Sequence, residues 1–429
     1  MNLDAVGKMT VLALNKAPFA VDGMNQGRQI RIGELNGANA QARGQELVRL
    51  LQRHEPVKQA LKITLAQPPA SPPQPVYFRV VSPQADALPW ECLYDPKQGF
   101  VALDRRWPLA RIGTLVYDVK ERSYRPPLNV LAVLSAAQRD ALPQLDALIS
   151  AVRKARKEGL DVHLHVISGQ QTVLERIAKN PAPYLSGQRL ETTPAALAAQ
   201  IGDAEPDIVH VLCHGTYSGT VPGLAFATKQ DLTGDEPVGT VVLATENLAG
   251  VLQPHDPWLV VLAACETAQS GDGAGFAHKL VDAGLPAVIG MRRLVNLGAM
   301  NTFTAAVYPE IFSLVNSAVG GNGNPGLPRV IEWSCALTAP RQAATVGVDP
   351  IVVDAWSDPV LYSQQDDLKV LVEPIDPVAA DQQGQLRAAL DTWSEYRQTL
   401  DPVTTPPDLL TEADETIARL RTLVEASRG

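Results

Sequence analysis

The sequence predicts an α/β protein with a mostly parallel sheet flanked by helices, preceded by an α+β region and followed by a helical appendage. From residue 128 onward, short apolar runs alternate with amphipathic helical patterns, as in parallel strands joined by crossover helices. The chain has 429 residues, enough for two or three domains, and its 45% hydrophobic and 19% charged residues are typical of a folded protein. We expect the three parts to be residues 1–127, 128–362 and 363–429.

The N-terminal part has short strand patterns and one helical pattern around a proline-rich break. MTVLAL (9–14) has the composition of a strand, and Leu47, Leu50 and Leu51 lie on one face of a predicted helix. The prolines of AQPPASPPQP (66–75) lack backbone N–H donors and favour an extended chain, so this segment predicts a stiff exposed connection. Short strands and turns follow it, in VYFRVV (76–81), LPWECLYD (88–95) and GFVALDRRWPLAR (99–111).

Three strands separated by helices open the sheet domain. The strands are LNVLAVLSA (128–136), DVHLHVISG (161–169) and PDIVHVLCHG (206–215). Between the first two, apolar residues at 3.6-residue spacing predict a helix that ends at Gly159. Before the third, Thr193 caps a helix that has Pro194 at its first position.

The alternation continues after the third strand. A Gly- and Thr-rich loop (216–240), with one hairpin-like strand in it, precedes a short helix near Thr245. The fourth strand is PWLVVLAACET (257–267), and a helix over 275–284 leads to the fifth strand, PAVIGM (286–291).

Helical patterns dominate the rest of the chain. One long helix is expected to kink at Pro309, and the Gly-rich stretch 320–329 predicts a flexible loop. Two amphipathic helices, on either side of DPVTTPPD (401–408), form the tail, which we interpret as an appendage or a docking surface.

The third and fourth strands carry the residues that point to chemistry. In an open parallel sheet, reacting groups gather at the carboxyl ends of the strands. His214 and Cys265 both lie at such ends, on consecutive strands, so a parallel pairing would bring a thiol beside an imidazole. An imidazole can remove the proton of a thiol at neutral pH, and the thiolate is a strong nucleophile. We therefore expect Cys265 to attack a carbonyl carbon, with an oxyanion hole formed by the N–H groups of Gly215 and Cys265.

The segments around these two residues resemble a known family. The segments CHG (213–215), LAACETA (262–268) and GAGFAHKLVDAGLPAVIGM (273–291) are similar to the CHAT domain, a caspase-like group of cysteine peptidases related to separase. The separation of His214 and Cys265, 265 − 214 = 51 residues, is close to the roughly 50 residues of caspase-like chains. LPWECLYD and WSDPVLY (356–362) extend the resemblance to residues 76–362.

The resemblance implies a caspase-hemoglobinase-like fold with an N-terminal pseudo-caspase-like region, and a cysteine endopeptidase with a His214–Cys265 dyad. It implies no cofactor, a protein substrate, and use in regulated proteolysis, including antiviral defence and cell-death pathways. A regulatory protein partner encoded nearby is expected to release the enzyme from an inactive state.

The segment after the fifth strand departs from the family pattern. Where many members have a Trp and an acidic residue, this chain has MRRLVN, with Arg293 near the Trp position and Asn296 near the acidic one. The substrate contacts expected here are Glu266, Arg292, Arg293 and Asn296. The two arginines favour an acidic rather than a basic side chain at the cleavage site.

Other functions are compatible with the same residues. The chain could be a catalytically silent scaffold that binds partners, or a thiol hydrolase or acyltransferase that acts on another carbonyl. His163 and His165 share a strand face, but no carboxylate or thiol nearby completes a metal site. GDGAG (271–275) lacks both phosphate-loop patterns, so it predicts a turn rather than a nucleotide site.

Composition and charge exclude further classes. A formal net charge of −9 disfavours broad nucleic-acid binding, and no apolar run reaches the length of a membrane span. The apolar run near the N-terminus is too short for a secretory signal. The four scattered cysteines suit free thiols in a reducing compartment, so a cytoplasmic protein is expected.

Overall fold

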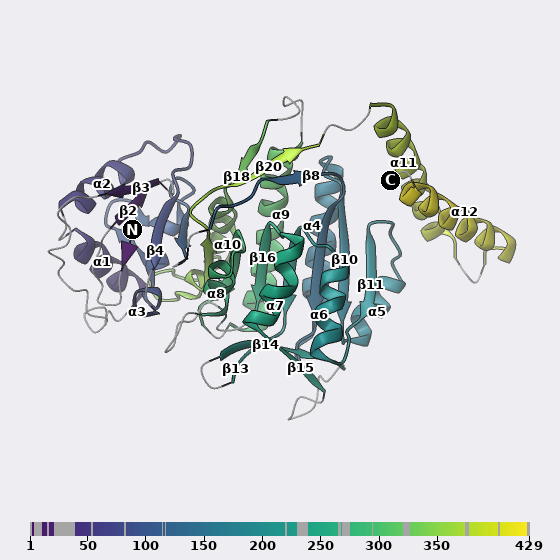
Figure 1. Ribbon diagram of the computed structural model, residues 1–429, viewed down its shortest axis with the longest axis horizontal. Helices are drawn as coiled ribbons and strands as arrows, with labels where there is room; N and C mark the ends of the chain where they lie inside the picture. The colour runs from purple at the N-terminus through teal and green to yellow at the C-terminus, as the bar shows by residue number, and fades with distance from the viewer. Residues whose placement is uncertain are drawn as a thin grey trace.

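The computed structural model describes most of the chain, and the fold is built around one long sheet (Figure 1). The described residues are 2–3, 11–14, 17–20, 39–52, 55–80, 83–113, 115, 117–218, 221–229, 239–264, 267, 275–293, 295–320, 327–373, 377–401 and 404–426. The sheet has twelve strands in the order β11-β10-β9-β12-β16-β17-β19-β7-β4-β2-β3, with β1 paired to β4. Its strands are β1 (Asn2–Leu3), β2 (Val11–Leu14), β3 (Ala17–Ala20), β4 (Val76–Val80), β7 (Leu109–Ile112), β9 (Leu128–Leu134), β10 (Val162–Ser168), β11 (Leu185–Arg189), β12 (Ile208–Leu212), β16 (Leu259–Ala263), β17 (Ala287–Met291) and β19 (Pro359–Ser363).

Most neighbours in this sheet are parallel, which confirms the predicted fold class. The antiparallel pairs are β17 with β19, β2 with β3 and β2 with β4. The sheet also runs without a break from the central strands through β19 into β7 and β4 of the N-terminal part. The division at residue 127 stays a prediction.

Helices cover both faces of the sheet. They are α1 (Ala40–Leu51), α2 (Glu55–Leu65), α3 (Pro83–Asp86), α4 (Leu142–Lys157), α5 (Gln171–Ala178), α6 (Pro194–Asp203), α7 (Thr245–Leu252), α8 (Phe276–Asp282), α9 (Leu297–Val319), α10 (Thr338–Ala343), α11 (Pro377–Thr399) and α12 (Pro407–Ala426). Short 3-10 turns lie between them, at η2 (Trp90–Cys92), η3 (Val101–Leu103), η4 (Gln253–His255), η5 (Trp333–Leu337) and η6 (Ala355–Ser357).

Alternate side chains of the central strands pack into two different cores. On β9, Val130 joins a core with α4 and α9, whereas Leu131 joins a core with α6, α7 and α8. Strands buried on both faces are typical of parallel sheets and explain their continuous apolar runs. A third core lies in the N-terminal part, where α1, α2 and β4 pack around Trp90 and Trp107.

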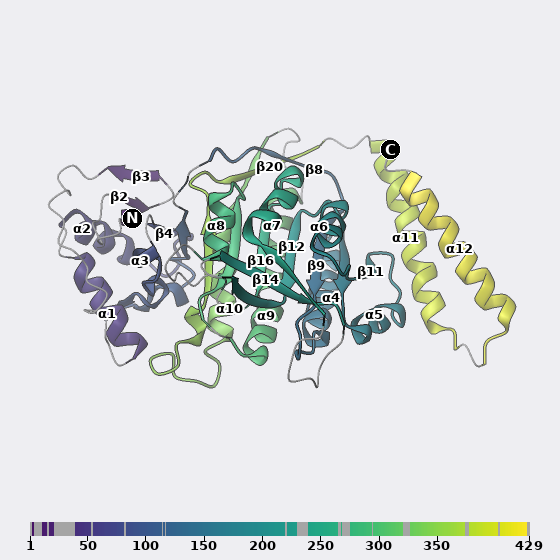
Figure 2. The same cartoon turned by 60° about the horizontal axis from the view of Figure 1, so that its bottom comes forward.

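Smaller sheets close the two ends of the central strands. β13 (His214–Ser218), β14 (Val221–Ala227) and β15 (Thr240–Ala244) form an antiparallel sheet at the carboxyl ends (Figure 1), the edge that comes forward in Figure 2. At the amino ends lies a sheet of β18 (Arg329–Ile331), β20 (Leu368–Val372) and β8 (Arg122–Tyr124) (Figure 1). A separate pair is formed by β5 (Tyr94–Asp95) and β6 (Gly99–Phe100). The predicted tail helices are present as α11 and α12, which pack together at the end of the molecule beyond β11 (Figure 1).

Several element predictions hold and several are wrong. Helix α6 begins as expected, since the Thr193 side chain accepts a hydrogen bond from Ala196 N. Helix α9 contains Pro309, and the kink expected there stays a prediction. The prediction that one strand runs through residue 215 is wrong, because β12 ends at Leu212 and the chain turns at Cys213. The loop over 216–240 instead contains β14, most of β13 and the start of β15. Helix α5 and strand β11 were not predicted, because both are short and β11 is largely exposed.

Candidate active site

The carboxyl ends of β12 and β16 place the two predicted dyad segments at one edge of the sheet. These strands are parallel neighbours, as predicted, and their last described pair is Leu212 opposite Ala263. His214 and Cys265 each follow that pair by two residues along the chain. Cys265 and Glu266 lie outside the described residues. On the histidine side the structure describes His214 and Gly215 themselves, and on the cysteine side it describes Ala264 and Thr267.

His214 starts an antiparallel strand rather than ending a parallel one. It pairs with Ala225 of β14, and Gly215 pairs with Leu224. Residues 214–218 have a Gly- and Thr-containing sequence that resembles a loop, but long-range pairing with β14 makes them a strand. The half-buried Gly215 thus lies beside His214 on a strand at the carboxyl edge, and its predicted oxyanion role stays a prediction.

The imidazole ring of His214 has a defined hydrogen-bond partner. Its Nε2 lies 2.7 Å from the backbone oxygen of Ala137, in the loop that follows β9. A carbonyl oxygen can only accept, so Nε2 must carry the proton and donate it. In the neutral ring, Nδ1 is then the nitrogen with a free lone pair. The ring is therefore fixed in the tautomer that can take a proton through Nδ1.

Thr267 anchors the chain on the far side of Cys265. Its buried hydroxyl donates to the backbone oxygen of Ala264 at 3.0 Å and accepts from Met291 N at 2.9 Å. Its backbone oxygen accepts from Ala277 N at 2.7 Å. One residue thus joins the end of β16, the end of β17 and the start of α8. No local pattern marks Thr267 for this role, although it lies within the segment LAACETA.

Arg292 and Arg293, two of the expected substrate contacts, are engaged within the protein. Arg293 pairs with Asp358 at 2.5 Å and with Asp354 at 2.8 Å. Burial opposes the charge of Arg293, but these carboxylates outweigh it and raise the pKa of the guanidinium. Arg292 donates from its side chain to the hydroxyl of Ser357 at 3.0 Å. An acidic substrate side chain would therefore compete with two carboxylates for Arg293.

Asn296 has a structural partner as well. It is the N-cap of α9, and its side-chain oxygen accepts from Ala299 N at 2.8 Å. Asparagine is a preferred residue at this position because it satisfies an N–H that the helix leaves open.

A buried charge cluster connects the segment LPWECLYD to the core. The guanidinium of Arg111 donates to Glu91 at 2.7 Å and to Asp86 at 2.8 Å, and none of the three side chains is exposed. Asp86 also accepts from the hydroxyl of Tyr362 at 2.7 Å and lies 3.1 Å from Nδ1 of His278. Burial lowers the pKa of His278, but the hydrogen bond to Asp86 and the nearby carboxylates outweigh it and raise the pKa. The cluster therefore ties helix α8 and strand β19 to the N-terminal part.

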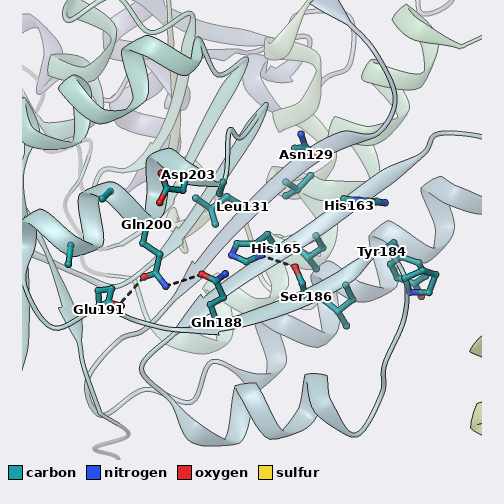
Figure 3. Close-up of a pocket in the computed structure, with 17 residues that line it drawn as sticks. Asn129, Leu131, His163, His165, Tyr184, Ser186, Gln188, Glu191, Gln200 and Asp203 are labelled. Carbon is teal, nitrogen blue, oxygen red and sulfur yellow. Dashed lines mark hydrogen bonds between the residues drawn. The ribbon is translucent and has the colours of Figure 1, made fainter. Parts of the chain in front are cut away.

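A polar groove of about 620 Å³ lies away from this edge (Figure 3). It runs beside α6 over β10 and β11, and its β9 residues belong to the amino end of that strand. His165 contacts the hydroxyl of Ser186 through Nδ1 at 2.7 Å, and Gln200 donates to Gln188 at 3.2 Å. The groove shares no lining residue with the predicted dyad.

Across the parts of the chain that the structure describes, no three His, Cys, Asp or Glu side chains gather as a possible metal site. No helix in those same parts combines the length and the apolar composition that crossing a membrane requires.

Comparison with known proteins shows the family of this chain and structures to which it is similar. A family model described as "CHAT domain" matches residues 41–313, well over half of the chain. No curated protein matches. Among solved structures, the chain is similar to a chain of the separase–securin complex of Saccharomyces cerevisiae, with 12% sequence identity and a TM-score of 0.36. The match covers 75% of this chain, which spans 17% of the length of that one.

Proposed function

Because the chain belongs to the CHAT family, a caspase-like peptidase family, we propose that it is a cysteine endopeptidase whose dyad is Cys265 and His214. The observation that carries this proposal is the hydrogen bond from Nε2 of His214 to Ala137, which leaves Nδ1 as the proton acceptor. The register of β12 and β16 supports it, because both dyad residues follow one strand pair by equal distances along the chain.

The proposed reaction proceeds in two stages. Nδ1 of His214 takes the proton of the Cys265 thiol, and the thiolate forms a bond to the carbonyl carbon of the scissile peptide. The N–H groups of Gly215 and Cys265 stabilise the oxyanion. The C–N bond then breaks, and the imidazolium gives its proton to the leaving amine. A water molecule, deprotonated by His214, attacks the thioester, which releases the carboxylate and restores the thiol.

The proposed substrate is a protein. Which residue it presents at the cleavage site is tested separately. Arg293 and Asn296 are already held by Asp354, Asp358 and the first turn of α9. A peptide library measures the preference directly. Cleavage only after Lys or Arg would remove the expectation of an acidic residue at that position.

Regulation by a partner belongs to the same proposal. A protein encoded beside this one would bind the chain and activate it, and the pathway would be one of defence or cell death. The support for this step is the family alone.

The test is cleavage of proteins encoded by neighbouring genes. Wild type is expected to yield fragments, whereas Cys265→Ala and His214→Ala yield none. Cys335→Ala is the matched control, because burial raises the pKa of that thiol to about 12 and so disfavours a reactive thiolate. Equal cleavage by wild type and Cys265→Ala would refute the dyad. Stable binding without cleavage by any variant would favour a silent scaffold, and turnover of small thioesters alone would favour a thiol hydrolase.

A further inference from the structure

The loop between β9 and α4 presents the oxygen that orients His214, and its backbone is strained. Ala137 supplies that oxygen, and the next residue, Gln138, has a φ of +56°. Residues other than glycine seldom adopt this left-handed conformation. Such a conformation persists only where surrounding contacts hold it.

Gln170 provides contacts on both sides of Ala137. Its side chain lies at the end of β10, and only 1% of its surface is exposed. Nε2 donates to the backbone oxygens of Ala136 at 3.1 Å and Arg139 at 2.6 Å. Oε1 accepts from Ala141 N at 3.1 Å. The two donors and the acceptor of one amide are thus all used on this single loop.

The same loop is joined to β12, which precedes His214, and to β14, which pairs with the strand that begins at His214. The N–H of Ser135 donates to Leu212 O at 2.9 Å, directly before the turn at Cys213. The backbone oxygen of Ser135 accepts from Ala227 N at 3.1 Å, on the strand that pairs with β13. Ser135 is thus held beside His214, whereas residues 136–141 are held by Gln170. A displacement of residues 136–141 would therefore move Ala137 relative to the imidazole ring.

We infer that Gln170 is a positioning residue for the dyad, which holds the Ala137 carbonyl against His214 and thereby fixes the tautomer of the ring. The inference rests on the proposed function for its consequence in catalysis. Its consequence for the ring does not depend on cleavage.

The test replaces Gln170 in the full-length chain. Gln170→Met keeps a similar length but removes all three hydrogen bonds, and Gln170→Glu keeps acceptor oxygens but removes both donors. We expect kcat to fall about 10- to 100-fold with KM changed by less than about 2-fold, because a shift of about 1 Å in a reacting group has an effect of this size. Nitrogen NMR shifts of His214 at pH 8, assigned with His214→Ala, should change from one Nε2–H tautomer to a mixture of both.

A matched control separates positioning from general destabilisation. Gln144 is also fully buried and contacts a different histidine, His210, at 2.8 Å. Gln144→Met should leave kcat and the tautomer of His214 as in wild type. A single Nε2–H tautomer in both Gln170 variants would overturn the inference, as would an equal change in Gln144→Met. If the wild type cleaves no substrate but the Gln170 variants contain both His214 tautomers, the proposed function would be refuted and the positioning role of Gln170 supported.

Discussion

Replacing Thr267 by valine is expected to destabilise the protein by about 2–4 kcal/mol. Valine has nearly the same shape, so the change removes the hydroxyl with little change in packing. The lost bond to Ala264 O is worth about 1 kcal/mol, and leaving Met291 N buried without its acceptor costs about 1–3 kcal/mol more. Thr267→Ser keeps the hydroxyl and loses one methyl group, so about 1 kcal/mol is expected.

Urea titration followed by tryptophan fluorescence measures both variants, since the chain has six tryptophans. Alkylation of Cys265 provides a second measurement, because the anchor lies two residues after the thiol. We expect a changed alkylation rate in Thr267→Val and a rate close to that of wild type in Thr267→Ser. A change of less than about 0.5 kcal/mol in the free energy of unfolding of Thr267→Val would refute the anchoring role of the hydroxyl, as would equal effects of serine and valine.

Three further changes test other parts of the fold. Arg111→Met should cost about 3–5 kcal/mol, because it leaves two carboxylates buried without a cation, whereas Arg105→Met, at an exposed pair, should change the free energy of unfolding by less than about 1 kcal/mol in the same titration. Gly169→Ala would place its Cβ 2.0 Å from the backbone oxygen of Ala227, so a marked loss of soluble folded protein is expected, and wild-type yield and melting temperature would contradict this contact. Burial raises the pKa of Asp207 to about 6. Between about pH 4 and pH 6 the folded state therefore keeps a proton that the unfolded state has lost, so the free energy of unfolding falls as the pH rises through this range. Asp207→Asn should therefore gain about 2–3 kcal/mol relative to wild type between pH 4 and pH 7, and a pH-independent difference would exclude the effect.

The periodic part of the fold was predictable from the sequence. β9, β12, β16 and β17 are largely apolar runs of five to seven residues. The helical patterns between these runs predict that the strands are parallel. β11, with the sequence LSGQR, has no such run, because every residue of it after Leu185 is exposed. Its membership in the sheet depends on pairing with β10, which the local sequence does not specify.

The sequence predicts which residues form the candidate site but does not predict its geometry. The sequence alone placed His214 and Cys265 near the carboxyl ends of two consecutive apolar runs, since such runs are local properties of the chain. Only the tertiary structure decided the orientation of the imidazole ring, because its partner is a backbone oxygen 77 residues away. Every residue carries such an oxygen, so no residue type marks Ala137 for this role.

The same distinction explains the charged residues. The sequence identified Arg293 as a cation after the fifth strand, but the carboxylates that neutralise it lie 61 and 65 residues further along the chain. Whether a charge is available to a substrate depends on which side chains the folded chain brings to it. Residue type and local pattern thus determined the apolar strands and the candidate residues, whereas contacts between distant segments decided which of the described side chains are oriented, neutralised or buried.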